Sequence, residues 1–231
     1  MVKRSALLLA LLAAALCVVG FQPTRPEEAK GAIGQTTIAL PAPESKSKVT
    51  VEEALAKRRS VRSYSTEPIT LQQVSQLLWA AQGITEPSRG LRTAPSAVAS
   101  YPLRLYLFAG NVKGLPAGAY RYIPQGHKLE LVASGDQRSN VGDQPQMRTA
   151  PALIAYIADY TDTAKSFGSD TARRWAAIET GHSAQNVLLE EVALGLVGVS
   201  MGLIDEAKMR STLKLTDNEE PLYAVSAGNK R

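Results

Sequence analysis

The 231-residue sequence predicts an α+β fold. Two segments carry apolar residues at helical spacing, residues 71–81 and 170–196, and six shorter segments have the apolar character of strands. These segments do not alternate regularly along the chain, so a doubly wound parallel sheet is disfavoured. Hydrophobic residues make up 45% and charged residues 20% of the chain, which excludes a disordered, collagen-like or polytopic membrane protein.

Composition divides the chain into three parts. Residues 1–20 have the layout of a signal peptide or N-terminal hydrophobic anchor, because Lys3 and Arg4 precede an apolar run over residues 6–19. A helix needs about 20 residues to cross a bilayer. We therefore expect an exported protein, periplasmic or extracellular, with a membrane anchor through residues 6–19 as the alternative. Residues 21–48 contain four prolines and predict a flexible linker, and residues 49–231 predict one folded domain.

Charge and cysteine content narrow the function classes. The chain carries 26 basic and 21 acidic residues, and 24 basic residues remain if residues 1–20 are removed. This small excess, with 6% aromatic residues, argues against a nucleic-acid binder. Cys17 is the single cysteine, so no internal disulfide is possible, and with only two histidines a Cys/His zinc site is disfavoured. Leu16 precedes Cys17, which makes a lipid anchor there a weaker alternative.

Two capping boxes mark the starts of the first helices. Residues 50–53 (TVEE) predict a short helix that ends near Arg58. Residues 70–73 (TLQQ) predict a second, amphipathic helix whose apolar positions continue to the stop at Gly83.

The strands follow from alternation and from one continuous apolar run. Residues 103–109 predict a strand, and residues 118–122 and 128–132 predict a hairpin around a Pro-Gln-Gly turn. Residues 151–158 are almost all apolar, which is typical of a central strand that is buried on both faces.

The C-terminal third predicts a long helix, two strands and a short helix. Gly181 interrupts the long helix of residues 170–196, at a cost of up to about 1 kcal/mol relative to alanine, unless something packs close to the backbone there. Short strands are expected at residues 197–201 and 222–227, with a small helix between them that Asp205 caps. The apolar stripe of the long helix is expected to consist of Trp175, Ile178, Val187, Leu188 and Val192.

The densest cationic feature follows the first helix. It offers guanidinium groups and a hydroxyl within five residues, a donor set that suits one phosphate: Arg58, Arg59, Ser60 and Arg62. The C-terminal Lys230 and Arg231 form a second basic cluster that can close on the same anion. The alternative is a solvated charge run at a helix C-terminus, where cations are favourable without any ligand.

Two short segments suit a planar ligand. Small residues in the loop of Pro95, Ser96 and Ala97 allow a ligand to approach the backbone, although a tight loop explains them equally well. Ser200, Met201 and Gly202 follow a predicted strand and present backbone N–H groups at its end. We find no catalytic triad, phosphate loop or dinucleotide glycine motif, so redox chemistry would have to come from a cofactor.

Taken in order, the segments of the predicted domain resemble the nitroreductase superfamily of FMN-dependent oxidoreductases, and within it the SagB-type dehydrogenases. The resemblance rests on stretches at residues 58–65 (RRSVRSYS), 93–108, 119–136, 150–158, 179–205 and 219–228. It implies a central, mostly antiparallel sheet flanked by helices, and a homodimer with FMN at the interface between subunits.

The resemblance also implies roles for the candidate residues. The FMN phosphate and ribityl chain would be held by Arg58, Arg59, Ser60 and Arg62, with Lys230 or Arg231 completing the phosphate site. The flavin would be contacted by Pro95, Ser96 and Ala97 from the other subunit and by Ser200, Met201 and Gly202. No protein side chain is expected to act as a catalytic acid or nucleophile.

Departures from the family pattern bear on the substrate. Ser200 stands where proline is common, and Ala99 stands where many members have asparagine near the flavin. The Lys-Tyr pair of azoline dehydrogenases is not evident in residues 165–169, so that activity is disfavoured.

The function expected from the sequence is ping-pong transfer of hydride or electrons to or from a small organic substrate. The reaction would be reduction of a nitroaromatic or quinone, or a dehydrogenation. The alternative is a non-catalytic flavin-binding or scaffold protein that retains the fold.

Overall fold

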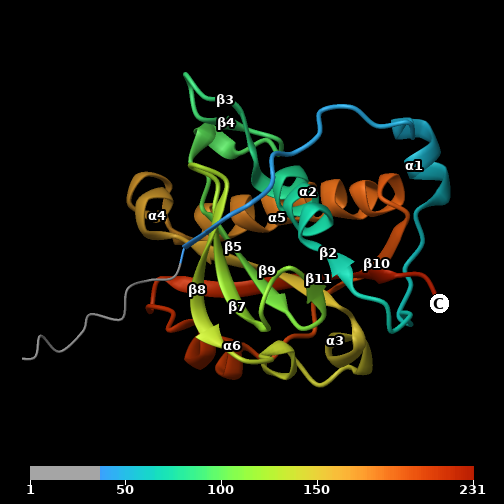
Figure 1. Cartoon of the computed structure of the whole chain (residues 1–231). Helices are drawn as coiled ribbons and strands as arrows, with labels where there is room; N and C mark the ends of the chain where they lie inside the picture. Colours follow the sequence, from blue (N-terminus) through green and yellow to red (C-terminus); the bar gives the residue numbers. More distant parts are fainter. Residues whose placement is uncertain (1–36) are drawn as a thin grey trace, which may run out of the picture. The chain divides into compact units, whose positions relative to one another are not determined.

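The computed structural model describes residues 37–231, and its centre is a seven-stranded sheet (Figure 1). All six neighbouring pairs in this sheet are antiparallel. From one edge to the other the strands are β1 (Thr37–Ala39), β8 (Lys128–Ser134), β7 (Gly118–Ile123), β5 (Leu103–Ala109), β9 (Ala152–Asp159), β11 (Glu219–Asn229) and β10 (Leu196–Met201). The predicted α+β class with a mostly antiparallel central sheet is confirmed.

Helices cover both faces of the sheet (Figure 1). One face packs against α2 (Leu71–Gln82) and α5 (Ser169–Ala193), and the other against α3 (Pro145–Thr149) and α6 (Glu206–Leu213). The strand predicted to be central and doubly buried is β9, which lies between β5 and β11 and is buried along Ala152–Ala158. The remaining elements are α1 (Val51–Lys57), β2 (Ile69–Thr70), β3 (Ile84–Glu86), β4 (Leu91–Arg92), η1 (Ala97–Ala99), β6 (Val112–Lys113), η2 (Arg138–Asn140) and α4 (Thr161–Phe167). No helix within residues 37–231 is long and apolar enough to span a bilayer.

One of the two predicted capping boxes forms completely. At α2 the backbone N–H of Gln73 donates to Thr70 Oγ1 (3.1 Å), and the Thr70 N–H donates to Gln73 Oε1 (2.8 Å). At α1 the Glu53 N–H donates to Thr50 Oγ1 (3.2 Å), but the Glu53 carboxylate pairs with Lys57 one turn later instead of returning to the cap. The Glu53–Lys57 pair at i,i+4 thus competes with the second half of the box.

The predicted flexible linker of residues 21–48 is wrong for its described part. β1 pairs with β8, and the backbone N–H of Glu44 donates to Gln76 Oε1 on α2 (2.8 Å). Leu40 is buried in the core beside α2. A strand of three residues and a few side-chain-to-backbone bonds are enough to fix a proline-containing segment, which composition alone does not show. Residues 1–36, with the predicted signal peptide, lie outside the described residues.

The predicted apolar stripe of α5 is also wrong in part. Val187 and Leu188 are buried, but Ile178 is 52% exposed. Polar residues occupy much of the buried face instead: Glu179, Thr180, Ser183 and Glu191. Hydrogen bonds such as Ser183 Oγ to the Ala81 carbonyl of α2 (2.7 Å) reduce the cost of burying them.

His127 ties the N-terminal segment to the sheet. Ser75 donates its hydroxyl hydrogen to the Pro41 carbonyl (2.5 Å) and lies 2.6 Å from His127 Nε2, while Tyr122 Oη lies 2.9 Å from His127 Nδ1. Because the Ser75 hydroxyl hydrogen is already donated to Pro41, His127 Nε2 must be the donor to Ser75 Oγ. Nδ1 then accepts from the Tyr122 hydroxyl, so the imidazole is neutral. Burial lowers the pKa of His127 below its usual 6.5.

We therefore expect acid to weaken the fold through His127. Above about pH 6.5 the imidazole is neutral in both states; as the pH falls, the unfolded chain takes up the proton first, so stability declines towards the lowered folded pKa. Urea unfolding at pH 7.5 and 5.5 should show a larger loss for the wild type than for His127→Asn. Asparagine tolerates the left-handed backbone at this position (φ 46°). An equal loss in both proteins would contradict this assignment.

Candidate functional site

The candidate site lies along β10, the edge strand of the main sheet. The segment after α1 runs beside this edge: Ser60 forms a parallel bridge with Gly198, and the Val61 N–H donates to the Gly198 carbonyl (2.9 Å). Further along, Tyr64 forms an antiparallel bridge with Lys230. The two basic clusters that the sequence predicts to share an anion therefore meet at one edge of the sheet.

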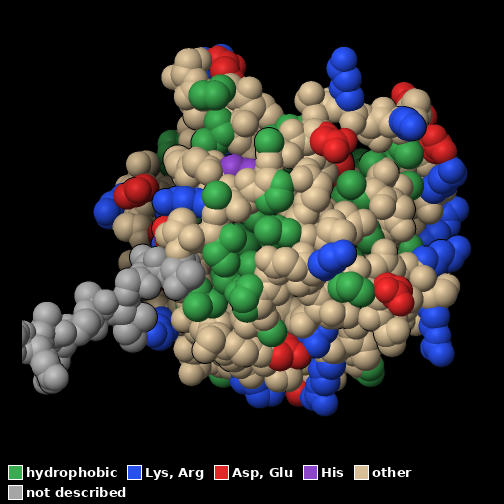
Figure 2. Space-filling view, viewed as in Figure 1, with side chains coloured by type: hydrophobic (Ala, Val, Ile, Leu, Met, Phe, Trp, Pro, Cys, Tyr) green, Lys and Arg blue, Asp and Glu red, His purple; other side chains and the backbone are tan. Residues whose placement is uncertain are grey.

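The cationic groups at this edge lack anionic partners. The side chains of Arg58, Arg62, Lys230 and Arg231 make no hydrogen bond or salt bridge with any residue that the structure describes. We call these four side chains and Ser60 the cationic edge. Figure 2 shows Lys and Arg side chains gathered on this side of the molecule, beside α1 and the C-terminus of Figure 1. Their mutual repulsion favours binding of an anion.

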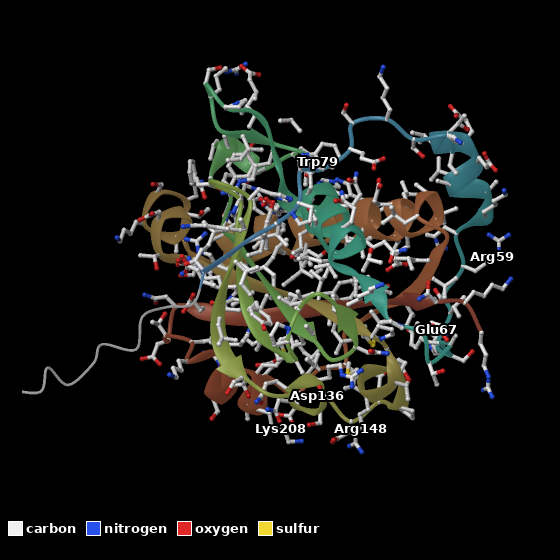
Figure 3. All side chains as sticks on the ribbon, in the orientation of Figure 1. Arg59, Glu67, Trp79, Asp136, Arg148 and Lys208 are labelled. Carbon is white, nitrogen blue, oxygen red and sulfur yellow. The ribbon has the colours of Figure 1, made fainter. Side chains whose placement is uncertain are left out.

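Arg59 differs from the other predicted arginines. Its Nη1 donates to the carbonyls of Ala56 (2.9 Å) and Arg58 (2.7 Å), so the guanidinium turns back onto the end of α1. Figure 3 shows Arg59 at the periphery beside α1. We therefore expect Arg59 to contribute less to anion binding than Arg58 or Arg62.

A buried carboxyl group lies behind the cationic edge. Glu191 of α5 is 2% exposed, and its Oε1 has no hydrogen-bond partner among the described residues. It fits against β10 only because Gly198 has no side chain: a Cβ there would come within 2.6 Å of Glu191 Oε2 and would also meet the Ser226 carbonyl. Burial raises the pKa of Glu191 well above its usual range, although the charge of Arg58 partly opposes the rise.

Glu191 should make stability fall as the pH rises. Below about pH 4.5 the carboxyl is protonated in both states; above it, the unfolded chain releases the proton while the folded chain retains it up to a higher pH. The advantage of Glu191→Gln over the wild type, measured as the free energy of unfolding in urea, should therefore grow from pH 5 to pH 8. A constant difference over that range would contradict a raised pKa.

A cavity of about 420 Å³ lies beside the same strand, at Ser200. Successive side chains of a strand point to opposite faces, so Ser200, which lines the cavity, shares a face with Gly198 at a distance of about 6.8 Å. The wall opposite β10 comes from α5: Ala177, Thr180, Gly181, Ala184, Gln185 and Leu188, with Leu222 and Tyr223 of β11 completing it. Such a volume suits a small organic ligand or cofactor.

Gly181 leaves this wall open. Apart from its chain neighbours and the backbone of its own helical turns, no described atom lies within 4 Å of the position that a Cβ would take there. Ser200 borders the cavity, Met201 is 3% exposed and points into the opposite core, and Gly202 is exposed at the end of the strand. Of the predicted trio, Ser200 and the backbone around Gly202 are the ones placed to meet a ligand.

The loop of Pro95, Ser96 and Ala97 lies away from the cationic edge. Ser96 Oγ accepts from the Tyr101 N–H (2.9 Å), and no hydrogen bond or salt bridge within residues 37–231 joins Pro95–Ala97 to the cationic edge or to Ser200–Gly202. The loop backbone is strained: three residues have left-handed φ angles, Val98 (49°), Ala99 (53°) and Tyr101 (46°). Strained loops of this kind cluster at binding sites.

Sequence reasoning missed Glu191, Gly198 and Tyr64 as parts of this region. Tyr64 Oη lies 2.6 Å from Ser226 Oγ and fixes the segment after α1 against β11. A glycine inside a strand, such as Gly198, signals close approach by another group. That signal was present, but the identity of the approaching group required the packing of α5 on β10.

Three comparisons with known proteins all match nitroreductases. The sequence model of the nitroreductase family matches residues 55–229. A candidate nitroreductase from Methanocaldococcus jannaschii is 37% identical over 186 residues, which cover 79% of this chain and 92% of that protein. The crystal structure of a candidate nitroreductase from Ralstonia eutropha superposes with a TM-score of 0.77 at 30% identity, over 84% of this chain and 90% of the other.

Two more distant similarities are to a toxin-operon protein and to a synthetase complex. The trifolitoxin operon protein TfxC of Rhizobium leguminosarum is 23% identical over 76% of this chain, and the match spans 54% of TfxC. A chain of the Escherichia coli microcin synthetase complex McbBCD has the same fold, with a TM-score of 0.64 at 20% identity over 94% of this chain and 85% of that one.

Proposed function

Because this chain belongs to the nitroreductase family of oxidoreductases, whose members generally use a flavin, we propose that it binds FMN along β10 and transfers hydride or electrons to or from a small organic substrate. In this proposal the FMN phosphate lies at the cationic edge, and the flavin ring lies at the cavity beside Ser200. The reaction follows a ping-pong scheme.

The observation that carries this proposal is the arrangement of charge and space along one strand. Four cationic side chains without partners lie at one end, and an uncharged cavity of about 420 Å³ lies at the other. FMN is arranged in the same way, because it carries a phosphate dianion at one end and a planar ring at the other. Arg58 and Arg62 offer charge-assisted donors, which bind phosphate more strongly than neutral ones.

The protein supplies binding, orientation and exclusion of water. FMN, when bound, supplies the redox chemistry. On β10 the Gly198 carbonyl points outward, towards Val61, so the N–H of Ser200 faces the same outer edge two residues later and is available to orient a ligand. Leu188, Leu222 and the Tyr223 ring form the water-excluding wall.

We further propose that two copies of the chain form each site. Ile178 and Gly181 lie three residues apart on α5, on one exposed face. A smooth, partly apolar helix face of this kind suits close packing of a second helix. The strained loop of Pro95–Ala97 would then reach the flavin of the partner subunit, which explains why it lies away from its own chain's cationic edge.

Gly181→Leu tests this arrangement. A Cβ at this position meets no atom of another element within 4 Å, so we expect the free energy of unfolding of the monomer to change little. Sedimentation equilibrium should show loss of the dimer, and FMN affinity should fall with it. A variant that remains dimeric and binds FMN as the wild type does would contradict the proposed interface.

The function is tested by adding FMN and then candidate donors and acceptors to the purified chain. We expect a yellow complex that NADH, NADPH or another donor reduces and that a nitroaromatic or quinone reoxidises. A complex that forms but never turns over would favour the alternative, a non-catalytic flavin-binding or scaffold protein. A chain that does not bind FMN at all would exclude both.

The branch of the family and the location of the protein are also proposals. The distant similarity to TfxC and to a microcin synthetase chain favours the SagB-type dehydrogenase branch. Export to the periplasm or exterior, or anchoring through residues 6–19, remains an expectation from the sequence. Fractionation of cells that express the full chain checks it.

A further inference from the structure

The strained loop of residues 95–101 is held towards the interior at its two ends, while its middle is exposed. Ser96 and Tyr101 are half-buried, whereas Val98 is 67% exposed and Ala99 is exposed as well. Left-handed backbone at residues other than glycine persists only where the surrounding structure determines it. The contacts at the two ends therefore hold the conformation of the middle.

Both ends belong to a closed network of polar contacts, which we call the Glu179 network: Gln82, Arg92, Ser96, Tyr101 and Glu179. Arg92 Nη1 donates to Gln82 Oε1 (3.0 Å), and Gln82 Nε2 donates to Glu179 Oε1 (3.1 Å). The Tyr101 N–H donates to Ser96 Oγ (2.9 Å), and the Arg92 N–H donates to Tyr101 Oη (3.2 Å). The Arg92 guanidinium also lies 4.5 Å from the centre of the Tyr101 ring.

Glu179 closes the network through Ser96. Because Ser96 Oγ accepts from the Tyr101 N–H, its hydroxyl hydrogen is available to the Glu179 carboxylate. Burial raises the pKa of Glu179 above its usual range, and hydrogen bonds from Ser96 and Gln82, together with the charge of Arg92, oppose the rise. Glu179 is 3% exposed, so little water reaches the carboxylate to replace either bond.

The network joins α2, β4 and α5 to the loop. Gln82 ends α2 and is fully buried, and its amide oxygen and nitrogen are both used within the network. Burial lowers the pKa of Arg92, and Glu179 is the charged neighbour that opposes this effect most. Glu179 and Arg92 thus form a charge pair that the Gln82 amide bridges.

From this geometry we propose that Glu179 is a positioning residue, which acts through Ser96 and Gln82 to hold the loop of Pro95–Ala97 in the conformation that contacts the flavin of the partner subunit. The inference rests on the proposed function and on its two-subunit site. Glu179 does not line the cavity of its own chain, so its effect on a flavin passes through the loop. Removing the carboxylate should weaken contact with the flavin ring and leave the phosphate contact intact.

Hydrogen exchange resolved by residue tests the hold on the loop, using the full chain without flavin. The reporter is the backbone N–H of Tyr101, which is bonded to Ser96. Its exchange should be about ten- to a hundredfold faster in Glu179→Ala than in the wild type, because hydrogen bonds to a charged group are lost. Glu179→Gln keeps a neutral acceptor of the same shape, so its exchange should be only about fivefold faster.

Ser183→Ala is the matched control. Ser183 is also buried on α5 and bonded to α2, but its hydroxyl donates to the Ala81 carbonyl rather than to the loop (2.7 Å). Exchange at Tyr101 should therefore be the same in Ser183→Ala as in the wild type. Wild-type exchange in Glu179→Ala, or an equal rise in Ser183→Ala, would overturn the proposal. If Glu179→Ala does not fold, Glu179→Gln and Ser183→Ala decide by the same comparison.

Flavin affinity then tests the positioning role. Glu179→Ala should weaken FMN and riboflavin by the same factor, about tenfold, because a loop that must be ordered on binding costs affinity for the ring that both share. Ser183→Ala should weaken neither. Faster exchange with unchanged affinity for both flavins would overturn the role at the flavin. A wild type that binds neither flavin would contradict the proposed function instead, and exchange at Tyr101 would still decide whether Glu179 holds the loop.

Discussion

Replacing Arg58 and Arg62 together by glutamine is expected to weaken FMN binding by about a hundredfold to ten-thousandfold. Each hydrogen bond to a charged group contributes about 1.5–3 kcal/mol, and a factor of ten corresponds to about 1.4 kcal/mol. Neither guanidinium makes a hydrogen bond or salt bridge with a described residue, so the fold should change little. Quenching of flavin fluorescence measures the dissociation constant.

Two controls separate the phosphate contact from other effects. Riboflavin has the same ring without the phosphate, so its affinity should be nearly equal in the wild type and in the double variant. Arg59→Gln removes a guanidinium that is bonded to carbonyls at the end of α1, and it should change FMN affinity far less. An equal loss for riboflavin and FMN would place the phosphate elsewhere.

Gly198→Ala is expected to destabilise the domain by about 3 kcal/mol, at the upper end of the usual cost of overpacking. The added methyl group meets the backbone carbonyl of Ser226 and the buried carboxyl of Glu191, and the carbonyl is part of the β10–β11 ladder. Relief requires β10 to move, which also displaces the segment at Ser60. Urea unfolding should show the loss of stability, and FMN affinity should fall with it.

Gly181→Ala is the matched control for that change. The new methyl group meets no atom of another element within 4 Å, and alanine favours a helix over glycine by up to about 1 kcal/mol. The free energy of unfolding of the single chain should therefore stay the same or rise slightly. The double variant Glu191→Ala/Gly198→Ala shows how much of the clash involves the carboxyl rather than the backbone. A Gly198→Ala protein as stable as the wild type would refute the close contact.

Local signals were sufficient for most of the fold. The helix at residues 71–82 could be predicted because its cap, apolar spacing and terminal glycine agree, and β9 could be predicted because burial on both faces leaves a continuous apolar run. The long helix was predicted in extent but not in orientation. Its buried face is partly polar, and partners on α2 such as Gln82 decide which residues are buried. Such long-range hydrogen bonds leave no periodic pattern in the sequence.

The cationic part of the candidate site could be predicted because its local composition is unusual. Three arginines and a serine within five residues are uncommon enough to indicate an anion, and the structure brings them beside Lys230. The fit of Glu191 against Gly198 could not be predicted, because it depends on how closely α5 approaches β10.

The position of β1 has a practical consequence for handling this protein. β1 and β10 are the two edge strands of the main sheet, separated by six strand spacings, or about 29 Å at about 4.8 Å each. The described chain therefore begins at the edge opposite the proposed FMN site. Coupling the protein to an electrode or bead at the β1 edge should leave the β10 edge open to donors and acceptors, whereas coupling through Arg231 should obstruct it.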